Sequence, residues 1–125
     1  MIFFENVSKI YNPIAPALEG VNITIHPKEF VSVVGQSGAG KTTLIKLLLA
    51  EERPTEGNVF FQSINLMDMR RDDVLSLRRR IGTVFQDFKL LPSKTAYENI
   101  AFAMEAAGRP DEEIVADVPQ ILELV

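Results

Sequence analysis

The chain has 125 residues, of which 46% are hydrophobic and 24% charged, and its formal net charge is -4. This composition is that of an ordinary globular domain and excludes the disordered, collagen-like and coiled-coil classes, while the lack of cysteine excludes disulfides and thiolate metal sites. The acidic balance gives no broad attraction to phosphate backbones, so nucleic acid is not an expected partner and any phosphate binding has to be local.

Three segments before residue 35 are typical of β-strands. Residues 2–7 and 21–25 are apolar or alternate between apolar and polar side chains, and Pro13 and Pro16 predict a loop between them. Residues 30–34 form a short β-branched run that leads directly into a glycine. This pattern predicts a strand buried on both faces of a parallel sheet.

Helical and strand patterns alternate along the rest of the chain. Leucines recur at helical spacing after Lys41, and Thr95 is a predicted N-cap. The expected strands are residues 58–61 and 81–85, and the expected helices are residues 72–80, 96–107 and a last one capped by Asp111. Strands that alternate with helices predict an α/β fold.

The segment of residues 35–42 reads Gly-Gln-Ser-Gly-Ala-Gly-Lys-Thr and matches G-x-x-x-x-G-K-[ST] at every specified position. Its glycines let the backbone wrap around phosphate groups, and the following helix N-terminus supplies a positive dipole. Lys41 is expected to reach the β- and γ-phosphates, and the Thr42 hydroxyl to ligate Mg²⁺. The nucleotide-binding residues predicted from this loop are Gly35, Ser37, Gly38, Ala39, Gly40, Lys41, Thr42 and Thr43.

Ser37 also suggests the nucleophile elbow of hydrolases, G-x-S-x-G. Ala39 stands where that motif needs its last glycine, and the single histidine, His26, precedes the serine instead of following it. The hydrolase interpretation is therefore excluded. The arginines within residues 70–80 are interpreted as a solvated helix face balanced by neighbouring aspartates.

Two further segments resemble the ABC-type ATPases. Residues 4–11, Phe-Glu-Asn-Val-Ser-Lys-Ile-Tyr, together with residues 17–22 are similar to the opening of these proteins. Residues 78–87, Arg-Arg-Arg-Ile-Gly-Thr-Val-Phe-Gln-Asp, resemble the segment that carries the glutamine of their Q-loop. The resemblance implies that Tyr11 stacks on the adenine of ATP and that Gln86 faces the metal and the γ-phosphate.

The resemblance also implies which residues catalyse, which bind Mg²⁺, and how the chain divides into domains. Lys41 and Gln86 are the expected catalytic residues, and Thr42 and Gln86 the expected Mg²⁺ ligands. The implied fold is the P-loop NTPase fold of an ABC ATPase nucleotide-binding domain, with residues 1–86 as a partial ATP-binding core and residues 87–125 as the start of a helical subdomain.

The family's Leu-Ser-Gly-Gly-Gln signature, its metal-binding aspartate, its catalytic glutamate and its switch histidine have no counterpart in the 125 residues. We therefore expect a domain truncated before the signature motif. The resemblance implies that the full-length parent is an ATPase that works as a homodimer, and we expect the 125-residue chain to be inactive in hydrolysis.

A finer resemblance, to the cell-division branch of the family, is carried by residues 51–55 and 86–102. It implies an ATPase that drives an FtsX-like membrane subunit at the cytoplasmic face of the plasma membrane. ATPases of lipoprotein-release or efflux transporters share most of these residues, so a transport function stays open, as does a non-hydrolysing nucleotide-binding module. The loop residues Phe88, Leu90 and Leu91 are a predicted docking surface for the membrane subunit. The alternative is that the leucines hold this loop against the chain's own helices.

Overall fold

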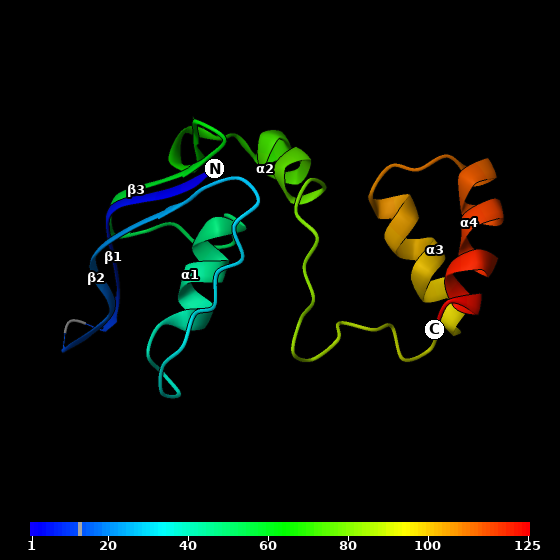
Figure 1. Ribbon diagram of the computed structural model, residues 1–125, viewed down its shortest axis with the longest axis horizontal. Helices are drawn as coiled ribbons and strands as arrows, with labels where there is room; N and C mark the ends of the chain where they lie inside the picture. Colours follow the sequence, from blue (N-terminus) through cyan, green and yellow to red (C-terminus); the bar gives the residue numbers. More distant parts are fainter. Residues whose placement is uncertain (13) are drawn as a thin grey trace. The chain divides into compact units, whose positions relative to one another are not determined.

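The computed structural model describes residues 1–12 and 14–125 (Figure 1). Contacts divide the chain into two compact units, Met1–Ile81 and Gly82–Val125, each of which is described by itself. The first unit contains β1 (Ile2–Asn12), β2 (Ala15–Ile25), α1 (Lys41–Leu48), β3 (Glu56–Phe61), β4 (Ile64–Asn65), the 3-10 helix η1 (Leu66–Asp68) and α2 (Arg71–Arg78). The second contains α3 (Ala96–Ala106) and α4 (Asp111–Glu123).

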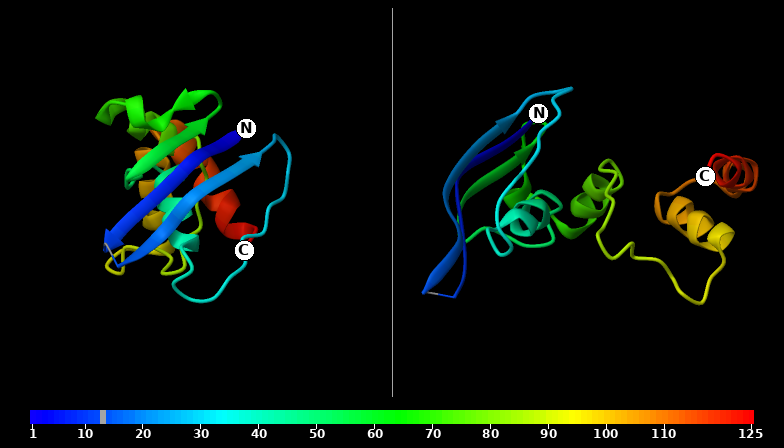
Figure 2. Two further views of the ribbon diagram at one scale, coloured as in Figure 1. Left: turned by 90° about the vertical axis from the view of Figure 1, so that its left-hand side faces the viewer. Right: turned by 60° about the horizontal axis from the view of Figure 1, so that its bottom comes forward.

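The sheet of the first unit has the strand order β2-β1-β3-β4, and each neighbouring pair is antiparallel. Phe4 in the central strand β1 lies opposite Ile23 of β2 and Val59 of β3. Helix α1 lies against one face of this sheet (Figure 2). The buried core of this unit, to which η1 and α2 also contribute, consists of Phe4, Val7, Leu18, Leu47, Val59, Leu66 and Leu77.

The strands expected at residues 2–7, 21–25 and 58–61 are confirmed, and β1 and β2 extend well beyond the expected bounds. The expected loop between them is shorter, because Pro16 lies within β2 and pairs with Ile10 of β1. Strand β2 is at an edge of the sheet, where a residue without a backbone N–H is tolerated. Pro13 lies outside the described residues.

The helices after Lys41 and after Thr95 are confirmed. Thr95 caps α3 as expected: its Oγ1 accepts a hydrogen bond from the Glu98 N–H, and the Glu98 carboxylate accepts one from the Thr95 N–H. Among the described residues no helix combines the length and the apolar character that crossing a bilayer requires.

The last helix differs from expectation in how it begins. Pro110 is the N-cap of α4, and Asp111 is its first helical residue instead of its cap. The helix continues through Pro119, whose ring removes the backbone hydrogen bond to Val115. Val115 itself is 66% exposed.

The strands expected at residues 30–34 and 81–85 are wrong, because both segments are irregular. Phe30 is 96%, Val34 85% and Val84 95% exposed. A strand of a parallel sheet exists only through hydrogen bonds to neighbouring strands. Within residues 1–12 and 14–125 the ladders are antiparallel and none of them includes these two segments.

Candidate nucleotide-binding site

The glycine-rich loop approaches strand β2 closely just before α1. Gly38 and Gly40 have φ angles of 82° and 85°, in the left-handed region that favours glycine. A Cβ atom on Gly40 would overlap the carbonyl oxygen of Ala17 and lie 2.8 Å from Cδ2 of Leu18. Glycine is therefore required at residue 40 both by conformation and by the contact with β2.

The N-terminus of α1 is open to an anion. Gly40 is its N-cap and supplies no side-chain hydrogen bond, and the first turn carries no acidic residue. The first N–H groups of a helix have no intrahelical partner, and the helix dipole favours negative charge at this end. The start of α1 therefore has the properties of a phosphate-binding site.

Lys41 is the first residue of α1, and its side chain folds back over the loop. Its Nζ donates hydrogen bonds of 2.7 Å to the carbonyl oxygens of Gly35 and Gln36. Both acceptors are neutral, and phosphate oxygens form stronger, charge-assisted hydrogen bonds with an ammonium group. The residues at this loop therefore fit a polyphosphate ligand.

The other residues predicted for the loop differ in exposure. Ser37, Ala39 and Thr42 are exposed, whereas the side chain of Thr43 is 8% exposed and belongs to the buried face of α1. Among the described residues no group of three or more His, Cys, Asp or Glu side chains forms a metal site. The exposed hydroxyl of Thr42 is an oxygen ligand of the kind that Mg²⁺ accepts.

Tyr11 lies at the end of β1 and is 56% exposed. Its hydroxyl donates a hydrogen bond to Oε2 of Glu52. The ammonium group of Lys9 lies over the tyrosine ring, 5.0 Å from its centroid. The ring is thus held at its hydroxyl end and covered by a cation on one face.

Glu52 connects this tyrosine to the helix that begins with Lys41. Its carboxylate lies 3.3 Å from Nζ of Lys9 and 3.0 Å from Nζ of Lys46, and Lys46 belongs to α1. The hydrogen bonds from Tyr11 and Lys46 lower the pKa of Glu52 to about 2, so it is ionised at neutral pH. Sequence reasoning missed Glu52, because a glutamate 41 residues from Tyr11 gives no local signal.

Gln86 lies in an exposed turn of the second unit. Lys41 and Thr42 belong to the first unit. Its role at the γ-phosphate and the metal stays a prediction.

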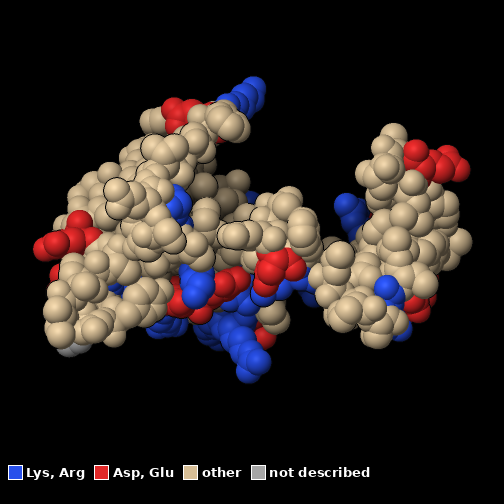
Figure 3. Space-filling model, turned by 90° about the horizontal axis from the view of Figure 1, so that it is seen from below, with Lys and Arg blue, Asp and Glu red and all other residues tan. Residues whose placement is uncertain are grey.

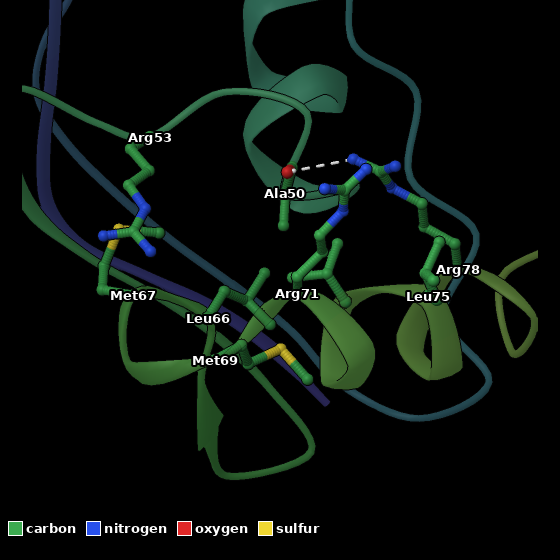
Figure 4. Close-up of a pocket in the computed structure, with 9 residues that line it drawn as sticks. Ala50, Arg53, Leu66, Met67, Met69, Arg71, Leu75 and Arg78 are labelled. Atoms are coloured by element: carbon green, nitrogen blue, oxygen red, sulfur yellow. Dashed lines mark hydrogen bonds between the residues drawn. The ribbon is translucent and has the colours of Figure 1, made fainter.

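An arginine-lined cavity of about 390 Å³ lies beside the residues that follow α1 (Figure 4). Arg78 reaches across it: its Nε donates to the Leu49 carbonyl at 2.9 Å and its Nη2 to the Ala50 carbonyl at 3.1 Å. A cation there satisfies the carbonyl end of α1, so Arg78 is not simply part of a solvated face. The cavity is about 12 Å along the helix from Lys41 and is distinct from the loop that fits phosphate.

Charged side chains elsewhere are mixed in sign. On the face drawn in Figure 3, basic and acidic groups lie among a larger uncharged surface. The guanidinium of Arg80 donates to Oε1 of Gln62 and lies over the ring of Phe61. Arg78 and Arg80 thus have specific partners and are not simply part of a solvated helix face.

The sheet, the glycine loop and the open start of α1 together define a nucleotide-binding domain of the P-loop NTPase class. The chain belongs to the ABC transporter family, whose model matches residues 18–125. The expected resemblance to ABC-type ATPases is thereby confirmed.

Within this family, the chain is similar in sequence to FtsE and MetN proteins. The chain is 46% identical to the cell division ATP-binding protein FtsE of Bacillus subtilis over 125 residues, which is all of this chain and 55% of that protein. It is 45% identical to FtsE of Mycobacterium tuberculosis and 39% identical to the methionine import ATP-binding protein MetN of Helicobacter pylori, covering 55% and 38% of those proteins. The chain thus spans about half the length of the FtsE proteins that it matches.

Solved structures confirm the fold. A dimeric post-hydrolysis state of the ATP-binding cassette MJ0796, bound to ADP and Pi, matches with a TM-score of 0.86 and 35% identity, over 98% of this chain and 56% of that one. CbiO1 of Clostridium perfringens, part of the ABC transporter complex cbiONQ, matches with a TM-score of 0.79 and 29% identity, over 98% of this chain and 49% of that one.

Proposed function

We propose that this chain is the ATP-binding part of an FtsE-like ABC complex. The observation that carries the proposal is the geometry at the start of α1. There, Gly40 lies against β2, the helix N-terminus is uncapped, and the Lys41 ammonium rests on neutral carbonyl groups. All three features favour a polyphosphate anion.

In this proposal the loop surrounds the phosphates and Tyr11 carries the base. Lys41 turns from the carbonyl groups of Gly35 and Gln36 to the β- and γ-phosphates, and Tyr11 offers an exposed ring for adenine. The backbone around the phosphates comes from Gly35, Ser37, Gly38, Ala39, Gly40, Lys41, Thr42 and Thr43. Thr43 contributes only through its main chain, because its side chain is buried.

Mg²⁺ would be held by the Thr42 hydroxyl and by Gln86. When bound, it neutralises charge on the phosphate oxygens. Lys41 stabilises the charge that develops on the transferred phosphoryl group, and Gln86 orients the attacking water. Lys41 and Gln86 are therefore the proposed catalytic residues of this chain.

The full-length protein, in this proposal, hydrolyses ATP as a homodimer and drives an FtsX-like membrane subunit in cell division, at the cytoplasmic face of the plasma membrane. The higher identity to FtsE proteins than to MetN supports this branch. The dimer that MJ0796 forms with ADP and Pi supports the dimeric ATPase. Residues 1–86 and 87–125 would be parts of its core and helical subdomain.

Two other functions stay open. MetN and cbiO1 belong to transport systems, so the chain could serve as the ATPase of a transporter, including the lipoprotein-release and efflux types. The second alternative is a nucleotide-binding module that does not hydrolyse ATP. Identifying the membrane subunit that copurifies with the full-length protein distinguishes a cell-division function from a transport function.

Phosphate release tests the proposed activity. We expect the full-length protein to release phosphate steadily and faster with its membrane subunit in vesicles. We expect the 125-residue polypeptide to bind ATP without steady release, since the family's catalytic glutamate, the expected general base, has no counterpart in its residues. Release by neither form, with ATP binding intact in both, would leave the non-hydrolysing module as the better description.

An apolar groove of about 550 Å³ in the second unit supports the proposed docking surface. Phe88 and Leu90 are 74% and 65% exposed at its rim. Leu91 is half-buried and fixed to α3, because its N–H donates to Oδ1 of Asn99 at 2.8 Å and its carbonyl accepts from the same side chain. The groove thus has a fixed inner wall and an exposed apolar rim, which suits an apolar segment of a membrane subunit.

Leu90→Glu in the full-length protein is expected to abolish copurification with the membrane subunit, because a carboxylate would be buried against an apolar segment. ATP affinity should stay within about threefold of wild type, less than 1 kcal/mol. Val115→Glu, an equally exposed position on α4 outside the groove, is the matched control. Retained copurification of Leu90→Glu contradicts docking here, and loss of ATP binding assigns Leu90 a structural role.

A further inference from the structure

We infer that Glu52 is a positioning residue for the base platform: it holds the Tyr11 ring at a fixed place relative to the helix that begins with Lys41. The inference rests on the proposed contact of Tyr11 with adenine and adds to it the residue through which that contact is oriented.

The Tyr11 side chain needs such a partner because it is more than half exposed. A side chain at the end of a strand with little packing around it can occupy several rotamers. The hydrogen bond from its hydroxyl to Glu52 fixes the far end of the ring, and the Lys9 ammonium lies over one face. The opposite face is therefore the one that a base can stack on.

Glu52 is itself anchored from two elements. Lys46 reaches Oε1 of Glu52 from α1 at 3.0 Å, and Lys9 reaches Oε2 from β1 at 3.3 Å. Lys9 also donates to the Arg53 carbonyl at 2.7 Å, so it is fixed beside the same turn. One carboxylate thus joins the end of β1 to the helix whose first residue is Lys41.

This arrangement sets the spacing between the base and the phosphates. The Lys41 end of α1 receives the triphosphate in the proposed function, and Lys46 lies five residues further along the same helix. Because Glu52 ties the Tyr11 hydroxyl to Lys46, the ring is placed relative to the phosphate-binding end. Positioned contacts of this kind lower the cost of ordering side chains on binding.

A glutamine cannot replace Glu52 fully. Its amide oxygen can still accept the hydrogen bond from Tyr11, but it carries no charge to balance Lys9 and Lys46. The charged form is the one that forms the stronger, shorter hydrogen bonds. Glu52→Gln should therefore loosen the ring without removing a large side chain.

The test compares ATP with inorganic tripolyphosphate, both with Mg²⁺, by calorimetric titration of the full-length protein. The variants are Tyr11→Phe, Glu52→Gln and the double variant, with Glu51→Gln as the matched control next in sequence. We expect Tyr11→Phe, which removes the hydrogen bond, to weaken ATP binding about three- to tenfold, and Glu52→Gln, which removes the charge of its acceptor, to weaken it by no more than that. The double variant should be no weaker than Tyr11→Phe alone, since Glu52 acts on the ring through the hydroxyl that this variant lacks.

Tripolyphosphate has no base, so its affinity should be unchanged in all four variants. Equal weakening of ATP and tripolyphosphate by Glu52→Gln would overturn the inference, because Glu52 would then act on the phosphate loop. Losses of ATP affinity that multiply in the double variant would also overturn the inference. Tyr11→Ala distinguishes failure of the adenine contact from failure of the role of Glu52. Unchanged ATP affinity of Tyr11→Ala refutes the adenine contact itself. If Tyr11→Ala weakens ATP binding but Tyr11→Phe and Glu52→Gln do not, only the role of Glu52 is refuted.

Discussion

Replacing Lys41 with alanine is expected to weaken ATP binding by at least about a hundredfold. The ammonium forms hydrogen bonds to charged phosphate oxygens, each worth about 1.5–3 kcal/mol, and two such bonds give a loss of this size. The fold should survive, because the acceptors left by the lysine, the carbonyl groups of Gly35 and Gln36, belong to exposed residues that water can reach. Titration with ATP measures the loss, and circular dichroism checks the fold.

A lysine elsewhere gives the control for this experiment. Lys94 forms a surface ion pair with Glu98 in the second unit, so Lys94→Ala removes the same charge without touching the loop. It should bind ATP as wild type does. Equal affinity of Lys41→Ala and wild type would remove the proposed phosphate site.

Gly40→Ala is expected to destabilise the protein and to abolish most ATP binding. Residue 40 has a left-handed φ of 85°, which costs an L-residue about 1–2 kcal/mol, and its new Cβ would overlap the Ala17 carbonyl of β2. The backbone of β2 cannot yield as a flexible side chain would, so the loop has to shift. A shift of the loop moves the N–H groups at the start of α1 away from the phosphates. Chemical denaturation and ATP titration measure the two effects.

Alanine substitutions at Gly38 and Gly82 distinguish the effect of backbone strain from that of steric overlap. Gly38 has a φ of 82° but open space around it, whereas Gly82 has open space and no unusual φ. We expect the loss of stability to increase in the order Gly82→Ala, Gly38→Ala, Gly40→Ala. A loss for Gly40→Ala no larger than that for Gly38→Ala would show that the contact with β2 is not tight.

The features that are local in sequence could be predicted from it. The phosphate loop is a continuous motif, the helix after Lys41 follows from leucine spacing, and the capping of α3 follows from Thr95 and Glu98. Each depends on residues within a few positions of one another. The approximate positions of strands β1 and β3 also follow from runs of apolar residues within each segment, although their antiparallel pairing does not.

The features that depend on distant partners could not be predicted. Residues 30–34 have the composition of a buried parallel strand, but strand formation needs a neighbour that no local pattern specifies. The link between Tyr11 and Glu52 joins residues 41 positions apart, and the capping of the Leu49 carbonyl by Arg78 joins residues 29 apart. The role of Gln86 stays a prediction for the same reason, because it depends on Lys41 and Thr42, which lie more than 40 positions earlier in the sequence.

The exposed run at residues 30–34 also affects how the polypeptide has to be handled. It consists of Phe-Val-Ser-Val-Val, carries no charge and lies outside the sheet, with Phe30 and Val34 almost fully exposed. A short, uncharged, β-branched segment with free backbone groups can pair with the same segment of another molecule. We expect self-association through this run at high protein concentration. Measurements on the 125-residue polypeptide therefore need dilute solutions and a check of its mass by light scattering.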